Sequence, residues 1–348
     1  MNYKTCWLTL NRACNLRCKW CYARDTGFLN SDNMNLDMVY QIVDICADLK
    51  IKHITIIGGE PTIYPYFNDV VKYIIKKGLT CGVVTNGVAL ADCKLLDKMI
   101  ETGQKSFSIS LKGENEKSFE QTTGTDYWKK VFQGIQNCIS RGCRISISMV
   151  LTEENMETFV EGIKKCYDMG VRNFRLSFCY DFDSSDKNDY IAKHNPYLLI
   201  EKFKKIYPIL NDVTHGNFKL FQSFPLCIWD ESFIKLLVKR KQITSICQLL
   251  NKTGLIFDSN GYLIPCNSMH KIKLGQINKD FDDYKSLINY VNSKKIVNVY
   301  NKLCALPSED CTRCNKLVNC GGGCVCQWTN YSYSEIMKGC QENGNKIA

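Results

Sequence analysis

The chain has 348 residues, and its 45 lysines and arginines outnumber its 35 aspartates and glutamates to give a formal net charge of +10. This length suffices for one large barrel or for two to three ordinary domains with an ample hydrophobic core. The basic residues are scattered, with only short runs such as 202–205 and 239–241, so the composition argues against a nucleic acid partner, which requires a clustered basic face.

The first 180 residues alternate short β-type runs with helical patterns. Runs rich in apolar and β-branched residues predict strands at 5–10, 53–57, 80–85, 106–111, 144–151 and 173–178. Apolar periodicity between them predicts helices near 36–50, 66–77, 89–102, 127–141 and 153–169. This alternation indicates a parallel sheet with right-handed crossovers, either an open sheet or a barrel.

Three closely spaced cysteines follow the first predicted strand: Cys14, Cys18 and Cys21. Thiolates are the usual protein ligands of iron-sulfur clusters, and three of them leave one iron of a four-iron cluster open to bind a cofactor. Zinc is the alternative, but a structural zinc ion takes four ligands and no obvious fourth one follows Cys21.

A Gly-Gly-Glu-Pro segment at 58–61 directly follows the second predicted strand. This segment and the C-x3-C-x2-C spacing, with the aromatic Trp20 before the last cysteine, together resemble the signature of the radical S-adenosylmethionine (radical SAM) enzymes. The resemblance implies an α/β fold, a partial (β/α)6 TIM-like barrel. In barrels of this kind the loops at the carboxyl ends of the strands carry the site, and both motifs fall on that face.

The resemblance also implies a mechanism and a set of cofactor contacts. An electron, from a donor such as flavodoxin or ferredoxin, would enter the first cluster and split S-adenosylmethionine, and the 5'-deoxyadenosyl radical would take a hydrogen atom from the substrate. The implied cofactor contacts are Trp20, Gly58, Gly59, Glu60, Pro61, Thr85, Asn86, Ser110 and Leu176. For two of them a structural role is the alternative, because Ser110 could bond the backbone and Leu176 could be core.

Residues 181–246 are less regular, with a polar linker at 181–189, a helical pattern at 195–210 and an amphipathic run at 233–241. We interpret this segment as a bridge. The chain is therefore divided into a barrel at 1–180, a bridging region at 181–246 and a Cys-rich domain at 247–348.

The last segment has its own cysteine spacing. Thirteen residues separate Cys247 from Gly261, four separate Gly261 from Cys266, and a C-x2-C-x5-C-x3-C run at 311–324 precedes a final cysteine. The spacing resembles the SPASM extension of radical SAM enzymes, which carries two auxiliary 4Fe-4S clusters and would bring the total to three; a pair of zinc knuckles is the alternative. The resemblance assigns Cys247, Cys266 and Cys324 to an inner cluster and Cys311, Cys314, Cys320 and Cys340 to an outer one.

The inner set lacks a fourth cysteine. Either Cys227, Cys304 or Cys326 supplies it, or the cluster keeps an open iron that a substrate could occupy. Cys227 is alternatively a hydrogen-atom donor at the barrel mouth or an inert core thiol. The remaining cysteines are interpreted as core residues: Cys6, Cys46, Cys81, Cys93, Cys138, Cys143, Cys166 and Cys179.

The cysteine content also bears on location. Twenty-one cysteines without a cleavable leader or a membrane-length apolar run favour the reducing cytoplasm and argue against a membrane partner. The four histidines, His53, His194, His215 and His270, lie in no motif with a matching acid and are interpreted as structural or surface residues.

SPASM-bearing relatives mostly modify peptides, so the leading hypothesis is an oxidoreductase-type peptide maturase that installs a cross-link, a thioether or an epimerised residue in a ribosomally made peptide. Only thirteen residues precede Cys14, so a separate leader-binding protein could assist in substrate capture. Asn267 stands where sulfatase-maturing relatives have an aspartate that acts as a base, and an asparagine side chain cannot take up the proton as a carboxylate does. This difference counts against sulfatase maturation. A tailoring enzyme of a small metabolite is the second hypothesis, and a non-catalytic metal-binding scaffold is the third.

Overall fold

The computed structural model describes residues 3–29, 31–179, 195–221, 223–244 and 247–328. A single eleven-stranded sheet with the order β11-β10-β9-β1-β2-β3-β4-β5-β6-β7-β8 organises these residues. Its strands are β1 (Thr5–Thr9), β2 (His53–Ile57), β3 (Thr80–Thr85), β4 (Ser106–Leu111), β5 (Arg144–Leu151), β6 (Phe174–Phe178), β7 (Phe218–Phe221), β8 (Ile243–Thr244), β9 (Gly254–Phe257), β10 (Tyr262–Leu263) and β11 (Gly275–Gln276).

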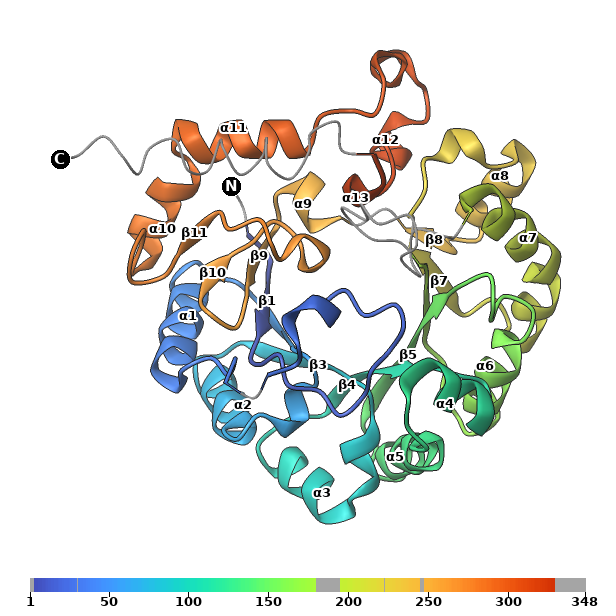
Figure 1. The fold of residues 1–348 in the computed structure, drawn as a ribbon, viewed down its shortest axis with the longest axis horizontal. Helices are drawn as coiled ribbons and strands as arrows, with labels where there is room; N and C mark the ends of the chain where they lie inside the picture. The colour runs from blue at the N-terminus through green and yellow to red at the C-terminus, as the bar shows by residue number, and fades with distance from the viewer. Residues whose placement is uncertain (1–2, 30, 180–194, 222, 245–246, 329–348) are drawn as a thin grey trace.

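Every neighbouring pair from β9 through β1 to β8 is parallel, whereas β10 runs antiparallel to both of its neighbours, β9 and β11. The sheet curves with its strands inside and its helices around the outside (Figure 1). Since β8 does not pair with β11, the barrel is open on one side, and the predicted partial barrel is confirmed. Parallel strands place all their carboxyl ends at one face, where the loops converge.

The helices that cover the sheet take their bounds from local sequence signals. Asn35 begins α1 by accepting hydrogen bonds from the amides of Asp37 and Met38, and Gly124 ends α4 in a left-handed conformation. The helices are α1 (Leu36–Asp48), α2 (Phe67–Lys76), α3 (Cys93–Glu101), α4 (Glu116–Thr123), α5 (Trp128–Ser140), α6 (Phe159–Asp168), α7 (Pro196–Val213), α8 (Glu231–Lys239), α9 (Gln248–Asn251), α10 (Tyr284–Val291), α11 (Lys294–Leu303), α12 (Leu317–Cys320) and α13 (Val325–Trp328).

The six predicted strands and the helix positions among them are confirmed, with two differences. The helix predicted at 89–102 is divided, because Asp92 caps α3 and a separate short turn precedes it. The helix predicted at 153–169 begins only at Phe159. In the bridge, the helical pattern at 195–210 corresponds to α7, and the run at 233–241 corresponds to α8.

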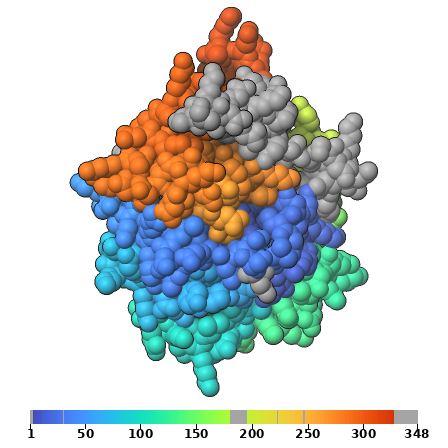
Figure 2. Space-filling view, turned by 60° about the vertical axis from the view of Figure 1, so that its left-hand side comes forward, coloured from blue at the N-terminus to red at the C-terminus, as the bar shows by residue number. Residues whose placement is uncertain are grey.

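The Cys-rich segment is built onto the barrel sheet. Its strand β9 pairs in parallel with β1, with Thr5 opposite Gly254 and Leu8 opposite Phe257. In Figure 2 the residues near 250–300 lie directly against the amino-terminal residues. The first strand after Cys247 therefore lies beside the strand that leads into the first cysteine loop.

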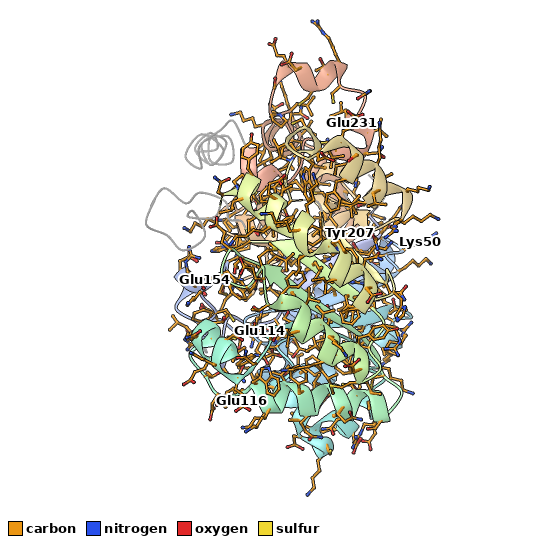
Figure 3. All side chains as sticks on the ribbon, turned by 90° about the vertical axis from the view of Figure 1, so that its right-hand side faces the viewer. Lys50, Glu114, Glu116, Glu154, Tyr207 and Glu231 are labelled. Carbon is orange, nitrogen blue, oxygen red and sulfur yellow. The ribbon has the colours of Figure 1, made fainter. Side chains whose placement is uncertain are left out.

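Exposed charged side chains mark the periphery of the molecule, while a few others, Arg12 and Glu60 among them, are buried. Lys50, Glu116 and Glu231 are exposed and stand at its periphery (Figure 3). The interior is one large apolar cluster that includes Phe107 and Phe174. Within the described residues, none of the helices combines the length and apolarity that crossing a bilayer requires.

Candidate active site

The cysteine loop that follows β1 is bonded to the Gly-Gly-Glu-Pro segment that follows β2. The amide of Gly59 donates to the carbonyl oxygen of Asn11 at 2.9 Å, and the amide of Glu60 donates to that of Ala13 at 2.7 Å. The side-chain amide of Asn11 also donates to the carbonyl oxygen of Glu60 at 3.0 Å. The two motifs thus form one rigid unit at the carboxyl ends of adjacent strands.

This close approach requires both glycines. A Cβ atom on Gly59 would lie 2.2 Å from the carbonyl oxygens of both Arg12 and Ala13, and one on Gly58 would lie 2.1 Å from Oδ1 of Asn11. Since no other residue lacks a Cβ, the Gly-Gly pair has a packing function in addition to any contact with a cofactor.

The far side of the cysteine loop is held by α4. The amide of Arg17 donates to the carbonyl oxygen of Thr123 at 2.9 Å, and the amide of Lys19 donates to that of Thr122 at 3.1 Å. These carbonyls lie at the end of a helix, where they have no partner within the helix itself. The three cysteines of the loop are therefore positioned from both ends of the segment.

Glu60 connects β2 to β3. Its carboxylate is 1% exposed and accepts hydrogen bonds from the amide and hydroxyl of Thr62, at 3.2 and 2.6 Å. It also accepts from the Thr85 hydroxyl and the Asn86 amide, each at 2.7 Å. Burial raises the pKa of this carboxyl, while the four donors oppose that shift.

The thiols of the first loop are partly buried, and this changes their acidity. Burial raises the pKa of Cys14 to about 12 and also raises the pKa of Cys18 and Cys21, while the Lys112 ammonium acts in the opposite direction on the latter two. A thiolate in this position needs a compensating cation, which cluster irons supply, and such binding releases the proton.

Three buried polar atoms near the start of the loop have no hydrogen-bond partner among the described residues: Thr9 Oγ1, Asn11 Oδ1 and Arg12 Nη1. Buried polar groups are nearly always paired, so unpaired atoms at the start of the three-cysteine loop leave hydrogen-bonding capacity for a polar ligand. Together with the three-thiol donor set, they fit a cluster with a polar, charged cofactor beside it.

Four other predicted cofactor contacts are a hydrogen-bonded serine and three buried side chains. Ser110 on β4 faces Ser148 on β5, with 3.2 Å between the hydroxyls, so it bonds a side chain rather than the backbone. Leu176 is fully buried on β6, and Pro61 is buried at the first position of a 3-10 turn. Trp20, 9% exposed, packs against Cys179 and Val150. Their roles toward the cofactor stay predictions.

The inner set of the Cys-rich segment also comes together. Cys247, Cys266 and Cys324 are half-buried, and the first of these thiols interacts electrostatically with the other two. Burial raises the pKa of Cys247 to about 12. A hydrogen bond from Cys326 lowers the pKa of Cys266 to about 7, so this thiol is the more easily ionised of the two.

The outer set lies at the end of the described chain. The amide of Cys314 donates to the carbonyl of Cys311 at 3.2 Å, and the thiol of Cys320 accepts from the Leu226 amide at 3.2 Å. Cys340 lies outside the described residues. Cys227 follows Leu226 and is exposed.

In the part of the chain that the structure describes, no three His, Cys, Asp or Glu side chains converge on one metal ion. The four ligands of a zinc ion share one centre, whereas each iron of a four-iron cluster takes its own thiolate. Every cysteine in the same residues is a free thiol.

The first cysteine loop and the inner set are linked directly. His270 Nε2 lies 3.1 Å from Oδ1 of Asp25, and Lys271 Nζ lies 2.9 Å from Oδ2 of the same carboxylate. The Tyr22 ring lies 6.4 Å from that of His270 and interacts electrostatically with both Cys21 and Cys266. The residues that follow Cys21 thus contact the residues that follow Cys266, and these contacts join the two candidate metal sites.

Most of the remaining cysteines and histidines lie where the sequence predicts. Among the eight predicted core cysteines, two depart from the prediction: Cys93 is exposed, because it begins α3 on the surface, and Cys143 is half-buried. His53 Nδ1 bonds the Thr80 hydroxyl at 2.8 Å, which is a structural contact between β2 and β3. His194 lies outside the described residues.

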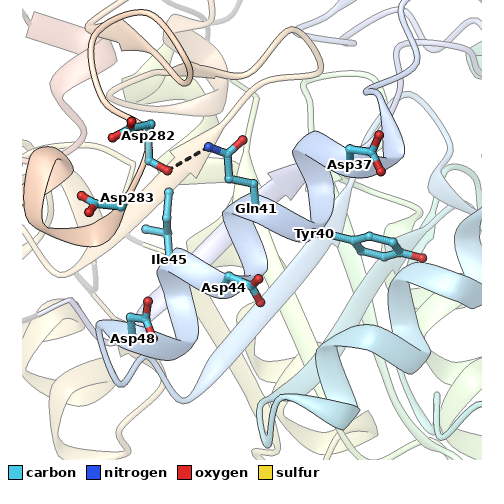
Figure 4. Close-up of a pocket in the computed structure, with 8 residues that line it drawn as sticks. All are labelled: Asp37, Tyr40, Gln41, Asp44, Ile45, Asp48, Asp282 and Asp283. Atoms are coloured by element: carbon cyan, nitrogen blue, oxygen red, sulfur yellow. Dashed lines mark hydrogen bonds between the residues drawn. The ribbon is translucent and has the colours of Figure 1, made fainter.

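An acidic cavity of about 400 Å³ lies elsewhere, on α1 where the segment before α10 meets it (Figure 4). Gln41 crosses it to the carbonyl oxygen of Asp282 at 2.8 Å. It contains none of the residues that the sequence predicts for the site; its lining is Asp37, Tyr40, Gln41, Asp44, Ile45, Asp48, Asp282 and Asp283.

Comparison with known proteins agrees with this geometry. Residues 8–166 match the family model of the Radical SAM superfamily. The matched part contains the three-cysteine loop and the Gly-Gly-Glu-Pro segment and is similar to the Radical SAM superfamily. The similarity that the two motifs indicate is confirmed.

One curated relative and two solved structures are informative. The GTP 3',8-cyclase of Clostridium perfringens strain SM101 is 30% identical over 165 residues, 46% of this chain and 50% of that protein. The chain thus spans about half the length of the curated relatives it matches.

The solved structures match nearly the whole chain. Streptococcus suis SuiB bound to its precursor peptide SuiA has a TM-score of 0.69 at 16% identity and covers 98% of this chain and 76% of that one. Native anSMEcpe with bound AdoMet and the Kp18Cys peptide has a TM-score of 0.68 at 18% identity and covers 97% and 96%. The described part of the chain, with the Cys-rich segment up to residue 328, therefore shares this fold.

Three residues that the sequence motifs did not single out lie at this site: Arg12, Lys112 and Asn15. Arg12 and Lys112 share a signal that could have identified them, since each follows the end of a barrel strand within a few residues. Asn15 has no such signal beyond lying between two of the cysteines.

Proposed function

We propose that this protein reductively cleaves S-adenosylmethionine and uses the resulting 5'-deoxyadenosyl radical to take hydrogen from a ribosomally made peptide, leaving a cross-link, a thioether or an epimerised residue. The observation that carries the proposal is the fold match over 97–98% of the chain to two proteins crystallised with peptides. This fold match extends beyond residues 8–166, which match the radical SAM family model, into the Cys-rich segment.

In this proposal Cys14, Cys18 and Cys21 would hold the first 4Fe-4S cluster, and this cluster would bind S-adenosylmethionine. When bound, the cluster supplies the electron that cleaves the cofactor. The chain's own residues do the rest: the bonded unit of Asn11 to Glu60 fixes the loop, and the buried polar atoms at Thr9 and Arg12 offer hydrogen-bonding positions.

The proposal assigns two auxiliary clusters to the Cys-rich segment, with an electron donor such as flavodoxin or ferredoxin as a partner. Peptide capture falls to the bridge, the Cys-rich segment or a separate leader-binding protein. The presence of many cysteines as free thiols favours a reducing compartment, for which we propose the cytoplasm.

A first experiment tests the chemistry without the peptide. Protein purified and reconstituted without oxygen is expected to hold about a dozen irons and to release 5'-deoxyadenosine with dithionite. Replacing Cys14, Cys18 and Cys21 with alanine should remove about four irons and abolish release. The exposed Cys93→Ala serves as the matched control. Zinc in place of iron and an intact cofactor would support the non-catalytic scaffold instead.

A second experiment tests the substrate. A short peptide encoded beside the gene is incubated with the active protein and examined by mass spectrometry. Loss of a pair of hydrogens indicates a cross-link or thioether, while uptake of one deuteron from heavy water indicates epimerisation.

A small metabolite is the second candidate, favoured by the similarity to GTP 3',8-cyclase. That similarity covers 46% of the chain, so it gives no information on what the rest recognises. GTP is therefore the test substrate for this second candidate. Consumption of GTP by the reconstituted protein, with the peptide left unchanged, would favour a small metabolite as the substrate.

A further inference from the structure

The inner cysteine set contains three residues of the family spacing, and three other cysteines are candidates for a fourth ligand: Cys227, Cys304 and Cys326. The structure separates these candidates by their contacts. A fourth thiolate would close the cluster, whereas three would leave an iron open to a substrate.

Cys326 is in direct contact with the inner set. It lies on α13, is 7% exposed, and its thiol interacts with those of Cys266 and Cys324. Cys247 interacts with the same two cysteines. Four sulfur atoms from three separate segments of the chain therefore gather at one place, partly or fully shielded from solvent.

The backbone around α13 fixes this arrangement. The amide of Cys324 donates to the carbonyl oxygen of Ser223 at 2.9 Å. Gly323 has a φ of +85° and no room for a side chain, since a Cβ would lie 2.7 Å from the backbone nitrogen of Pro225. The bridge thus holds the turn that presents Cys324 and Cys326 together.

The other two candidates lie in different surroundings. The thiol of Cys304 lies 4.0 Å from the carbonyl oxygen of Leu249, and its electrostatic neighbour is Lys252 rather than an inner cysteine. Cys227 is exposed, and the adjacent Leu226 amide bonds Cys320 of the outer set.

We propose that Cys326 is the fourth ligand of the inner auxiliary cluster, so that this cluster is closed and does not bind substrate through an iron. The inference rests on the auxiliary clusters of the proposed function. It changes the expected role of the inner site from substrate anchoring to a cluster held entirely by protein thiolates. The inner ligand set then becomes Cys247, Cys266, Cys324 and Cys326.

The test compares Cys326→Ala with Cys304→Ala in the full chain, reconstituted without oxygen. Iron and sulfide per chain are measured together with electron paramagnetic resonance spectra before and after addition of cyanide, a ligand for open irons. Cys326→Ala is expected either to lose about four irons or to gain a cyanide-sensitive signal, and Cys304→Ala to match the wild type. Wild-type iron and spectra in Cys326→Ala, or a loss confined to Cys304→Ala, would overturn the proposal.

A second measurement covers the case in which Cys326→Ala does not fold. The variant without the three first-loop thiols retains only the auxiliary clusters, and its spectrum is expected to be unchanged by cyanide. A cyanide response there would show an open auxiliary iron and contradict the proposal. Release of 5'-deoxyadenosine depends on the first cluster, so its absence in the wild type would instead count against the proposed function.

Discussion

The side-chain amide of Asn86 donates a hydrogen bond to Oδ1 of Asn15 at 2.6 Å and so joins the end of β3 to the middle of the first cysteine loop. Asn15 lies between Cys14 and Leu16, whose amide lies 3.4 Å from the Cys14 thiol. The position of the first thiol therefore depends on a residue 71 positions away.

Replacing Asn86 with alanine should loosen this loop. The Asn86 amide can still bond Glu60 through the backbone, so only the link to Asn15 and the turn contact to Val88 are lost. A net loss of about 1 kcal/mol is expected, which corresponds to roughly fivefold weaker binding of S-adenosylmethionine. Equilibrium dialysis measures the affinity and iron analysis the cluster content; the exposed Asn173→Ala is the control. Unchanged affinity and iron would contradict the prediction.

Gly59→Ala should disrupt the site more severely. The new Cβ would lie 2.2 Å from two carbonyl oxygens of the cysteine loop, and backbone atoms cannot rotate away as a side chain can. Overpacking of this kind costs about 1–3 kcal/mol, and here the strain falls on the loop that carries the thiols. We expect loss of the first cluster, measured by iron content and visible absorption.

Gly82→Ala is the matched control for that variant. Gly82 lies on β3, where a Cβ would meet only the ring of His53, at 3.0 Å, and this ring can shift. Comparable loss of iron in both variants would indicate that the effect is general destabilisation of the barrel rather than a local clash.

Much of the fold could be predicted because the barrel strands are short runs rich in apolar and β-branched residues, separated by amphipathic helices. The sequence of α4 is mostly polar and only Phe119 and Thr123 are buried, so no apolar pattern predicts this helix. Strands β7 and β8 are four and two residues long, which is too short for a sequence pattern to predict them. Their pairing with β6 depends on the sheet that is already formed, not on local pattern.

The candidate site could be predicted only where cysteines and glycines stand in fixed spacing. The contact of Asn86 with Asn15 and that of Cys326 with Cys266 join distant parts of the chain and follow from the folding of the sheet. The family spacing has no position for Cys326. The sequence alone therefore gives no reason to prefer Cys326 over Cys227 or Cys304 as the fourth ligand of the inner cluster.

The contact between His270 and Asp25 predicts a pH dependence of stability. Burial lowers the pKa of His270, with the Asp25 carboxylate opposing that shift. The unfolded chain therefore takes up a proton near the ordinary pKa of about 6.5, while the folded chain resists it to lower pH. The contribution of His270 to stability is present above that pH and should diminish as the pH falls through 6.5 toward the lowered pKa.

The measurement compares guanidinium unfolding of the wild type and His270→Gln between about pH 5 and 8, because glutamine can keep a neutral hydrogen bond to Asp25 but does not titrate. The wild type should lose stability relative to the variant on acidification. A difference that does not vary with pH, or that grows in the opposite direction, would refute the assignment of the effect to His270.

Arg12 is expected to influence the reduction potential of the clusters. Its guanidinium is 4% exposed, has an unpaired Nη1 and acts electrostatically on Cys21. It also acts on Tyr22, which lies between that cysteine and Cys266. A buried cation near thiolate-bound irons favours the reduced, more negative state of a cluster, so its removal should make reduction harder.

We therefore expect Arg12→Gln to shift a cluster potential downward, by about 60 mV for each 1.4 kcal/mol of lost interaction, in a redox titration followed by electron paramagnetic resonance. Arg12→Lys retains the charge but not the planar guanidinium, so it should restore most of the potential if charge is the cause. Arg17→Gln is the control, because Arg17 is exposed and bonds the carbonyls of Cys14 and Leu16 on the outside of the same loop. An equal shift in Arg17→Gln, or none in Arg12→Gln, would show that the buried charge does not set the potential.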